Sequence, residues 1–579
     1  WRGEMRYGLL NDVRKLDKER YPLMVQRFVA LALDADAPPP PLETIQPPRL
    51  RVDSDAVAAA RADQPADAAR RIQADVAFLA DDLLEGRAAG TRGYDLAALY
   101  VANRYRAIGL EPAGDDGSYL QAVSLLEGRR QREGAGFSIR RDNGLIEFTF
   151  QDDFLPGVNY NAATHAVTAP LVFVGQGVHA PDLDHDDFDG VDLRGKIAVY
   201  FSGAPADFPD TQRAFHASGR QKMLAFAERG AIGAVQIGNP VDEAKYPWAR
   251  GARNWAMPGM RLVGSDGQPV DSYPQLRATA SLGVHAARRL FEGAEMDAEE
   301  VFARREAGTL EAFDLPGQAT LSGSTTLERV TSHNVVGRLA GSDPSMASEH
   351  IVYTAHLDHV GRGAEVDGDD IYNGAFDNAL GTAVMLEAAT ELVAGPAPGR
   401  SLLFVALTAE ERGLLGAEHF ASNPGVEGTL VANINMDMPV FLADVSDVVP
   451  IGIEHSSLEQ DVRAAAEMLG IGLTPDPKPE EVVFVRSDQY AFVRQGIPAV
   501  YLDAGIKARS PDVDALALYE DFLTGHYHQP SDETSLPIHY PSAARLAMLN
   551  AAIGRRVGDA AQKPGWKDGD FFGRTFGGQ

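Results

Sequence analysis

The chain has 579 residues, 45 % of them hydrophobic, and a formal net charge of −29 at pH 7. This length exceeds what one hydrophobic core fills, so several domains are expected. The negative charge repels nucleic acids and anionic membrane surfaces and argues against both as partners. No stretch reaches the roughly 18 consecutive apolar residues that a membrane-spanning helix requires.

The sequence contains no cysteine. Disulfides, thiolate metal sites and cysteine nucleophiles are therefore excluded together. Any transition metal must be held by histidine, aspartate and glutamate side chains. A chain without disulfides is compatible with the cytosol and with the periplasm, so this observation leaves the compartment open.

The first part of the chain predicts a charged helix over residues 4–33, followed by a proline-rich, extended linker at 38–48. Residues 28–33 resemble the apolar core of a signal peptide. That run is too short, however, and acidic residues follow it at once. Because the chain begins with Trp1 and not with Met, we expect its natural start to lie upstream.

Helical periodicity begins near Ala66, and a second helix is predicted over residues 96–108, ending at Gly109. Between about 157 and 321 the pattern changes to short β-like runs separated by acidic, glycine-rich turns. These features predict a small β-rich unit with one or two helices. Its acidic run at 182–189 lacks the spacing of a calcium loop and favours a solvated turn.

From Ser332 onward, strand-like and helix-like stretches alternate, which predicts an α/β sheet covered by helices on both faces. Ligands of such sheets gather at the carboxyl ends of the strands. The predicted strands cover residues 334–339, 350–355, 401–408, 430–435 and 499–502, and the predicted helices cover 382–392, a stretch from about 416, 459–469 and 489–495.

Histidines and carboxylates follow these predicted strands. Taken singly, each has an ordinary explanation: a glutamate pair at a helix start favours the helix dipole, and an aspartate caps a turn. Their joint occurrence, in this order and at these places, indicates a metal-dependent hydrolase. The residues are His356 and Asp358, then Asp377 between glycines, Glu410 and Glu411, Asp437, and the loop 525–532 with His526 and His528.

The residue types suit a pair of zinc ions about 3.5–4 Å apart, which needs a bridging carboxylate and further ligands on each side. In an adjacent glutamate pair, one residue can bind metal while its neighbour moves a proton from water to the leaving amine. A carboxylate two residues after a ligand histidine, as at Asp358, fits a partner that orients the imidazole.

Six segments resemble the co-catalytic di-zinc aminopeptidase family, which includes aminopeptidase Y, the bacterial leucyl aminopeptidases and glutamate carboxypeptidase II. The resemblance covers about residues 66–558, apart from an inserted unit. The segments are His356-Leu-Asp-His, Gly374-Ala-Phe-Asp-Asn-Ala-Leu-Gly, Leu403-Phe-Val-Ala-Leu-Thr-Ala-Glu-Glu-Arg-Gly-Leu-Leu-Gly, Asn435-Met-Asp, Ser487-Asp and Tyr527-His.

This resemblance implies two zinc ions. His356 and Asp437 would bind one ion, Glu411 and His528 the other, and Asp377 would bridge them. It also implies a peptide as substrate and, by the habit of the family, a periplasmic or secreted location.

Further roles follow from the same resemblance. Glu410 would be the general base, Asp358 the partner of His356, and Tyr527 a donor to the oxyanion of the tetrahedral intermediate. Arg486 would bind substrate. The family often has a cis peptide bond after the bridging acid, so Asp377–Asn378 is expected to be cis.

Three nearby histidines, His359, His419 and His526, are expected to lie outside the metal site. The inserted unit resembles a protease-associated domain, on the segments 191–200 and 227–235, and would form a wall or lid near the cleft.

The expected fold is a three-layer α/β/α zinc exopeptidase domain with a mixed sheet, interrupted by the β-rich insert. The expected boundaries are an N-terminal extension and linker at 1–65, the catalytic domain at 66–150 and 326–560, the insert at 151–325, and a C-terminal tail at 561–579.

The leading hypothesis for function is an aminopeptidase. A carboxypeptidase or dipeptidase on the same scaffold stays open, as does a mono-zinc enzyme resembling glutaminyl cyclase. A receptor-like binding protein on this fold would be expected to lack metal ligands, and here every ligand position is filled.

Overall fold

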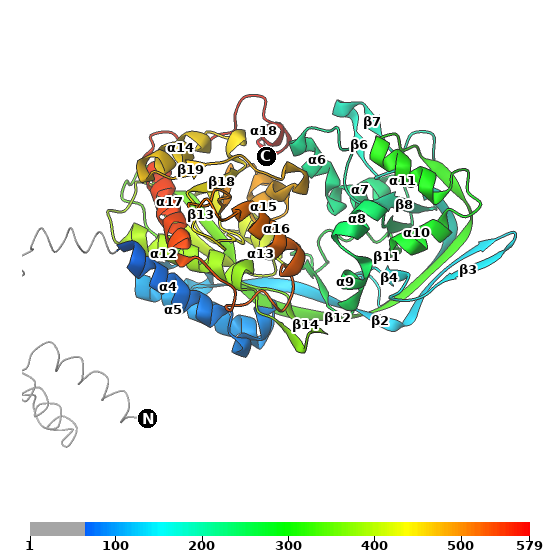
Figure 1. Cartoon of the computed structure of the whole chain (residues 1–579), viewed down its shortest axis with the longest axis horizontal. Coiled ribbons are helices and arrows are strands. Elements are labelled where there is room, and N and C mark those ends of the chain that lie inside the picture. Colours follow the sequence, from blue (N-terminus) through cyan, green and yellow to red (C-terminus); the bar gives the residue numbers. More distant parts are fainter. Residues whose placement is uncertain (1–63, 579) are drawn as a thin grey trace, which may run out of the picture. The chain divides into compact units, whose positions relative to one another are not determined.

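The computed structural model describes residues 64–578. The helix expected over residues 4–33, the proline-rich linker and the signal-like run lie outside the described residues. The described part has two lobes, each built around hydrophobic clusters of its own (Figure 1). None of its helices is long and apolar enough to cross a membrane.

The first lobe is built on a mixed sheet with the strand order β19-β18-β20-β17-β13-β16-β12. Its central strands β20, β17, β13 and β16 run parallel, β12 is antiparallel to β16, and β18 is antiparallel to β20 but parallel to β19. The bounds are β12 Phe313–Leu339, β13 Glu349–His356, β16 Ser401–Leu407, β17 Thr429–Asn435, β18 Asp447–Ile451, β19 Gly472–Leu473 and β20 Ala499–Ala504.

Successive side chains of a strand point to opposite faces of the sheet, and in these strands both sets are apolar. Helices therefore cover both faces. In β13, Ile351 and Tyr353 pack into the cluster with α4, α5, α12, α14, α16 and α17, whereas Val352 packs with α13 and α15 on the opposite face. The expected three-layer arrangement is confirmed. The bounds are α4 Gln64–Leu79, α5 Arg92–Ile108, α12 Gly381–Val393, α13 Leu415–Ser422, α14 Leu458–Leu469, α15 Gln489–Val493, α16 Ala515–Gly525 and α17 Tyr540–Asp559.

Local signals fix the ends of α5. The hydroxyl of Thr91 caps its N-terminus by accepting the amide of Tyr94 at 3.4 Å. At the other end, Gly109 adopts a φ of 100°, a left-handed conformation that glycine takes without steric cost. The predicted stop at Gly109 is confirmed, and the helix begins four residues earlier than its predicted start at residue 96.

The second lobe is itself an α/β unit. Strands β5, β8, β9 and β11 are parallel, and β4 is antiparallel to β11. The bounds are β4 Phe154–Pro156, β5 Thr164–Phe173, β8 Ile197–Phe201, β9 Gly233–Ile237, β11 Ala278–Leu282, α6 Asp210–Ala217, α7 Gly219–Glu228, α8 Pro240–Lys245, α9 Trp248–Arg253, α10 Val284–Leu290 and α11 Ala298–Ala307.

The expectation of only one or two helices in this unit is wrong. Its helices are six to ten residues long. Two or three turns present too few apolar positions for a clear helical period, so the sequence pattern was dominated by the strands.

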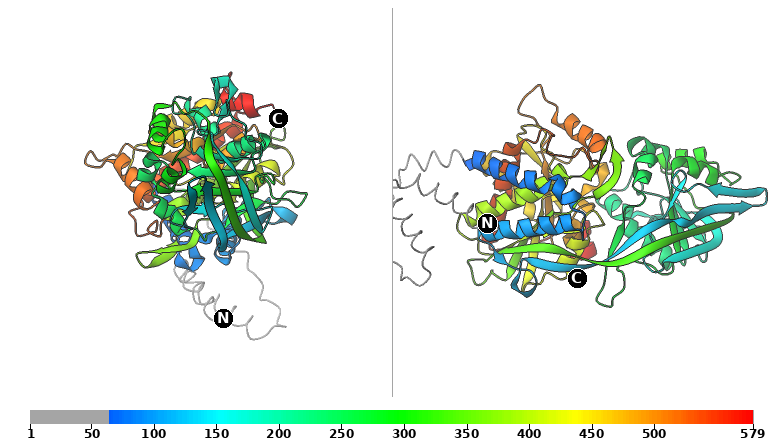
Figure 2. Two further views of the ribbon diagram at one scale, coloured as in Figure 1. Left: turned by 90° about the vertical axis from the view of Figure 1, so that its right-hand side faces the viewer. Right: turned by 90° about the horizontal axis from the view of Figure 1, so that it is seen from below.

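Two long strands join the lobes (Figure 2). β12 pairs with β5 of the second lobe through residues 313–324 and with β16 of the first lobe through residues 335–339. Between these ends it pairs with β2 (Leu120–Arg141), which also carries β3 (Gly144–Phe148). The backbone ladder is therefore continuous from one lobe to the other.

The chain ends in a packed helix, α18 (Phe571–Phe576). Phe572 is fully buried in a cluster with Phe484 and Val493, and its ring centroid lies 5.3 Å from that of Phe484. This contact attaches the last residues to the loop between β19 and α15.

We predict that Phe572→Ala lowers the free energy of unfolding by about 3–5 kcal/mol, because it leaves a cavity in a closed cluster. Met468→Ala is the matched control, since Met468 is 67 % exposed on α14 and its loss should change stability by less than about 0.5 kcal/mol. Denaturant unfolding followed by tryptophan fluorescence measures both. Equal effects of the two variants would contradict the packing role.

Candidate metal centre

The carboxyl ends of three neighbouring parallel strands meet at one edge of the first-lobe sheet. His356 is the last residue of β13. Glu410 and Glu411 follow the end of β16 by three and four residues, and Asp437 follows β17 by two. Because the strands are parallel and adjacent, these side chains converge although the chain separates them widely.

Asp377 reaches the same place from a tight turn at residues 375–380. The peptide bond between Asp377 and Asn378 is cis, as expected. The turn is held by Asp532, whose two carboxylate oxygens accept the amides of Phe376 at 2.9 Å and Asp377 at 3.0 Å. The loop that contains His528 thus fixes the turn that contains Asp377.

The first group of ligand atoms consists of His356, Asp377 and Asp437. Nε2 of His356 lies 2.9 Å from Oδ1 of Asp437 and 3.2 Å from Oδ1 of Asp377. Nδ1 of His356 lies 3.0 Å from the backbone carbonyl of Asp358 and donates to it. With the proton held on Nδ1, Nε2 is free to bind a metal ion.

The second group lies on the other side of Asp377. Nε2 of His528 is 3.2 Å from Oδ2 of Asp377 and 3.1 Å from Oε2 of Glu411. Asp377 therefore directs one carboxylate oxygen toward each group. This is the arrangement of a carboxylate that bridges two metal ions.

His359 also belongs to this second group, so the expectation that it lies outside the site is wrong. Its Nδ1 is 2.7 Å from Oε1 of Glu411 and 3.8 Å from Oδ2 of Asp377. His359, Asp377 and Glu411 form a set of ligand atoms that could hold a metal ion. The ring is fully buried, three residues after His356, because the chain turns back toward the site directly after β13.

The orientation of these atoms tests whether a metal ion fits. Nδ1 of His359 and Oε1 of Glu411 are close, yet both are buried without a hydrogen-bond partner among the described residues. Buried polar atoms are rarely left so. Lone pairs that converge on a common point, rather than on each other, suit a bound cation, and nitrogen and carboxylate donors suit zinc. The residues at this site therefore fit bound zinc ions.

Asp358 acts differently from the expectation. Its backbone carbonyl, and not its carboxylate, binds His356. The carboxylate instead accepts the amides of Glu410 at 3.0 Å and Glu411 at 3.4 Å. The expected carboxylate–imidazole contact is therefore wrong. Because the chain turns after β13, the carbonyl faces the ring while the side chain crosses to the loop after β16.

Crowded acidic groups dominate the electrostatics of the site. Burial raises the pKa of Glu410 well above its usual range, and burial together with the nearby Glu411 raises that of Asp358 to about 6. Burial would also raise the pKa of Glu411, but the His528 and His359 rings hold it well below its usual range. A bound cation would reduce the repulsion among so many carboxylates, so the site favours cation binding.

A buried arginine supports the loops around the site, and sequence reasoning missed it. Arg87 is 1 % exposed and donates to the carbonyls of Leu357 at 2.9 Å, Asn373 at 2.6 Å and Gly374 at 3.1 Å. Burial lowers the pKa of Arg87 to about 10, so it remains charged at neutral pH. The only sequence signal was its place in a glycine-rich segment at 85–93.

Another missed residue is Asp488, which follows Ser487 in one of the family-like segments. Its carboxyl is fully buried without a hydrogen-bond partner among the described residues, and burial raises its pKa well above the usual range. Asp532 was also missed, although the loop containing it was singled out. Nothing local in the sequence distinguishes these buried acids from surface aspartates.

Three non-glycine residues at the site adopt left-handed backbone conformations. Ala409 precedes the glutamate pair with φ 54°, Met438 follows Asp437 with φ 39°, and His528 itself has φ 53°. Such conformations cost about 1–3 kcal/mol each and persist where surrounding contacts hold them. The candidate ligands Glu411, Asp437 and His528 thus lie at or close to abrupt changes of chain direction.

The remaining expected residues lie around the same space. Tyr527 stacks on His528, with ring centroids 3.9 Å apart, and lines the pocket beside the ligand groups. Arg486 lines the same pocket and donates to the carbonyl of Glu481 at 3.2 Å. His526, as expected, faces away from the ligand groups, with Nδ1 2.9 Å from the hydroxyl of Ser531.

The second lobe contacts the His528 loop directly. Arg250 of α9 donates to the carbonyls of Thr524, at 2.9 Å, and Tyr527. Tyr246, at the end of α8, lines the same pocket as the ligand groups. The inserted lobe therefore forms part of the wall of the site.

The carboxyl edge of the first-lobe sheet thus carries two groups of candidate metal ligands that share Asp377. Residues 334–553 match the family model described as Peptidase family M28, so this part of the chain is a Peptidase family M28 domain. The match contains every expected ligand and, with it, the carboxyl edge of the first-lobe sheet.

Two longer similarities agree with this result. The probable lipoprotein aminopeptidase LpqL of Mycobacterium tuberculosis is 22 % identical over 505 residues, covering 83 % of this chain and 82 % of the relative. The solved aminopeptidase from Aneurinibacillus sp. strain AM-1 is 20 % identical, with a TM-score of 0.50, and the match covers 86 % of this chain and 95 % of that one. At this identity the structural similarity concerns the fold.

A short similarity of another kind is present. Lipopolysaccharide heptosyltransferase 2 of Escherichia coli is 79 % identical over 34 residues, which is 6 % of this chain. The protein thus spans only 10 % of the length of that relative. A match of this length carries no information on the peptidase domain.

We predict that His359→Ala weakens zinc binding about 10–100-fold, because the variant loses either a ligand or the group that fixes Glu411. Isothermal titration of the metal-free protein with zinc measures the change. His526→Ala is the matched control: the same substitution, two residues from His528, should leave zinc affinity unchanged. An unchanged affinity in His359→Ala would remove His359 from the metal centre.

Proposed function

We propose that this protein is a di-zinc exopeptidase that releases N-terminal residues from peptides. The observation that carries the proposal is the shared Asp377, which directs one oxygen to His356 and the other to His528. Two further observations support it: the Peptidase family M28 match and the long similarity to a probable aminopeptidase.

In this proposal His356 and Asp437 would hold one zinc ion, Glu411 and His528 would hold the other, and Asp377 would contribute an oxygen to each. When bound, two zinc ions polarise the scissile carbonyl and make water more acidic. The buried carboxylates that otherwise repel one another would then be neutralised.

Glu410 is the proposed general base. It lines the pocket beside His356 and Asp437 and is assigned to neither ligand group. Its carboxylate takes a proton from the attacking water and passes it to the leaving amine. Asp358 positions it by binding the amides of Glu410 and Glu411, so the base and one ligand are held by the same side chain.

Tyr527 is the proposed donor to the oxyanion that forms at the scissile carbonyl. Burial raises the pKa of its phenol well above the usual range, and the nearby Asp377 and Glu411 raise it further. The hydroxyl therefore keeps its proton at neutral pH and can donate a hydrogen bond. Arg486, which lines the same pocket, is proposed to bind the substrate backbone.

The charges around the pocket favour an aminopeptidase over a carboxypeptidase. A carboxypeptidase needs a free cation for the terminal carboxylate of its substrate. The two cations that line this pocket are paired: Lys478 lies 2.7 Å from Glu520, and Arg486 lies 3.4 Å from Glu481. The amino group of a peptide, in contrast, would meet carboxylates.

The proposed domain division keeps residues 66–150 and 326–560 as the catalytic domain and 151–325 as the insert. Contacts of Arg250 and Tyr246 with the His528 loop and the pocket support a role of the insert as a wall that limits access. The name of the lipoprotein relative supports export, so a periplasmic or secreted location is proposed.

A panel of amino-acid arylamides and N-acylated peptides tests the proposal. We expect hydrolysis of substrates with a free amino terminus, loss of activity in a chelator, and recovery on addition of about two equivalents of zinc. N-acylated substrates should not be cleaved. Cleavage of the N-acylated peptides, or activity that persists in chelator, would contradict the proposal.

We predict that Glu410→Gln keeps the metal content of the parent protein but loses about 10²–10⁴-fold in kcat, because the variant lacks the proton acceptor. Asp377→Ala should lose both metal and activity. Metal analysis after gel filtration, together with the arylamide assay, separates the two effects. Parental activity in Glu410→Gln would overturn the assignment of the base.

A further inference from the structure

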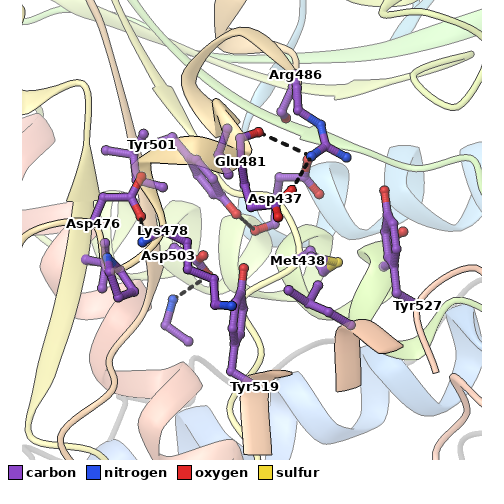
Figure 3. Close-up of a pocket in the computed structure, with 18 of the residues that line it drawn as sticks. Asp437, Met438, Asp476, Lys478, Glu481, Arg486, Tyr501, Asp503, Tyr519 and Tyr527 are labelled. Carbon is purple, nitrogen blue, oxygen red and sulfur yellow. Dashed lines mark hydrogen bonds and ion pairs between the residues drawn. The ribbon is translucent and has the colours of Figure 1, made fainter. Parts of the chain in front are cut away.

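The pocket that contains the ligand groups extends beyond them into a space with apolar walls (Figure 3). Met438, Val449, Ile451 and Leu523 line it. In Figure 3, Tyr527 lies at one side of the pocket, and Asp476, Asp503 and Tyr519 lie at the other. A side chain of the substrate residue next to the scissile bond would occupy this extension.

The extension contains a buried acid. Asp503 lies near the end of β20 and is 6 % exposed. One of its oxygens accepts the amide of Ala504 at 2.6 Å. No lysine, arginine or histidine of residues 64–578 forms an ion pair with it, unlike most acids that are buried to this extent.

A second acid nearby is also without a counter-ion. Asp476 accepts the amide of Lys478 at 2.8 Å but, in the part of the chain that the structure describes, forms no ion pair. The adjacent ammonium of Lys478 is directed to Glu520 instead, at 2.7 Å. Two carboxyl groups therefore line a space with apolar walls, and the nearby ammonium of Lys478 is already paired with Glu520.

We propose that this extension selects substrates whose N-terminal residue is lysine or arginine, with Asp503 as the group that recognises the cationic end. The inference rests on the proposed aminopeptidase function. The long hydrocarbon stem of such a residue suits the apolar walls, and its charged end suits an acid at their far side. A neutral aliphatic side chain would leave the buried Asp503 and the half-buried Asp476 without a counter-ion.

The titration behaviour of the empty pocket agrees with this geometry. Burial, with Asp437 and Asp476 nearby, raises the pKa of Asp503 to about 8. The phenol of Tyr519 keeps its proton because burial and the nearby Asp503 and Asp476 raise its pKa, so its hydroxyl remains a donor beside Asp503. A bound ammonium or guanidinium group would lower the pKa of Asp503 and stabilise its ionised form, for which residues 64–578 supply no counter-ion.

The test is a comparison of kcat/KM for arylamides of lysine, arginine, norleucine, leucine and glutamate, with the zinc-loaded full chain. We expect lysine and arginine to be the best substrates. In Asp503→Asn, which keeps the size of the side chain, the ratio of lysine to norleucine should fall about 100-fold, as when one partner of a buried ion pair is removed. Asp476→Asn should lower the same ratio by a smaller factor.

Asp521→Asn is the matched control, because Asp521 is exposed on α16 and forms no ion pair among the described residues. Its ratio should equal that of the parent. A parent enzyme that prefers leucine, norleucine or glutamate, or an unchanged ratio in Asp503→Asn, would overturn the preference while leaving the aminopeptidase intact. If no arylamide is cleaved, the aminopeptidase itself fails.

If no arylamide is cleaved, a binding measurement still tests whether the pocket prefers a cationic side chain. Calorimetric titration of the zinc-loaded Glu410→Gln variant with lysinamide and with norleucinamide reports recognition without hydrolysis of the amide. Tighter binding of lysinamide, lost in Asp503→Asn, would support the acidic extension even in an inactive protein. Equal affinities for the two amides would overturn it.

Discussion

Repulsion among buried acids at the end of the first-lobe sheet is the constraint on which the rest of the structure depends. Asp358, Asp377 and Asp532 are buried within one small region together with the glutamate pair. Each buried carboxylate loses its hydration, and several together repel one another. Backbone amides, histidine rings and the guanidinium of Arg87 offset the cost of burying these carboxylates.

These compensating contacts also explain how the loops are arranged. Asp358 binds the amides of the glutamate pair, and Asp532 binds the amides of the turn that contains Asp377. Each acid thus fixes the loop that carries another acid. A site of this kind is pre-organised before any cation arrives, and its left-handed residues can be tolerated because neighbouring contacts hold them.

The inserted lobe contributes to the same region through continuous strands rather than through a flexible linker. β12 pairs with strands of both lobes, so the ladder of backbone hydrogen bonds continues from the first lobe into the lobe that carries α8 and α9. Arg250 then joins the insert to the backbone of the His528 loop. The insert meets the first lobe at other places as well, such as the ion pair of Arg220 with Glu418 and the contact of Arg213 with the carbonyl of Pro479.

Much of the site was predictable from the sequence because strand ends have clear local signals. An apolar run followed by His356, or by Glu410 and Glu411, marks the end of a buried strand, and parallel neighbours must place such ends together. Sequence patterns also predicted the sheet with helices on both faces and the stop of α5 at Gly109. The family resemblance predicted the cis bond at Asp377–Asn378.

Only the tertiary structure shows which way backbone and side-chain groups face and which charged side chains are buried. The sequence could not show that the carbonyl of Asp358, and not its carboxylate, faces His356, since one turn of the chain sets this. It gave no reason to place His359 in the site, or to select Arg87, Asp503 and Asp532 from many similar surface residues. Burial is a property of the whole fold, and the chemistry of a charged side chain depends on it more than on its neighbours in sequence.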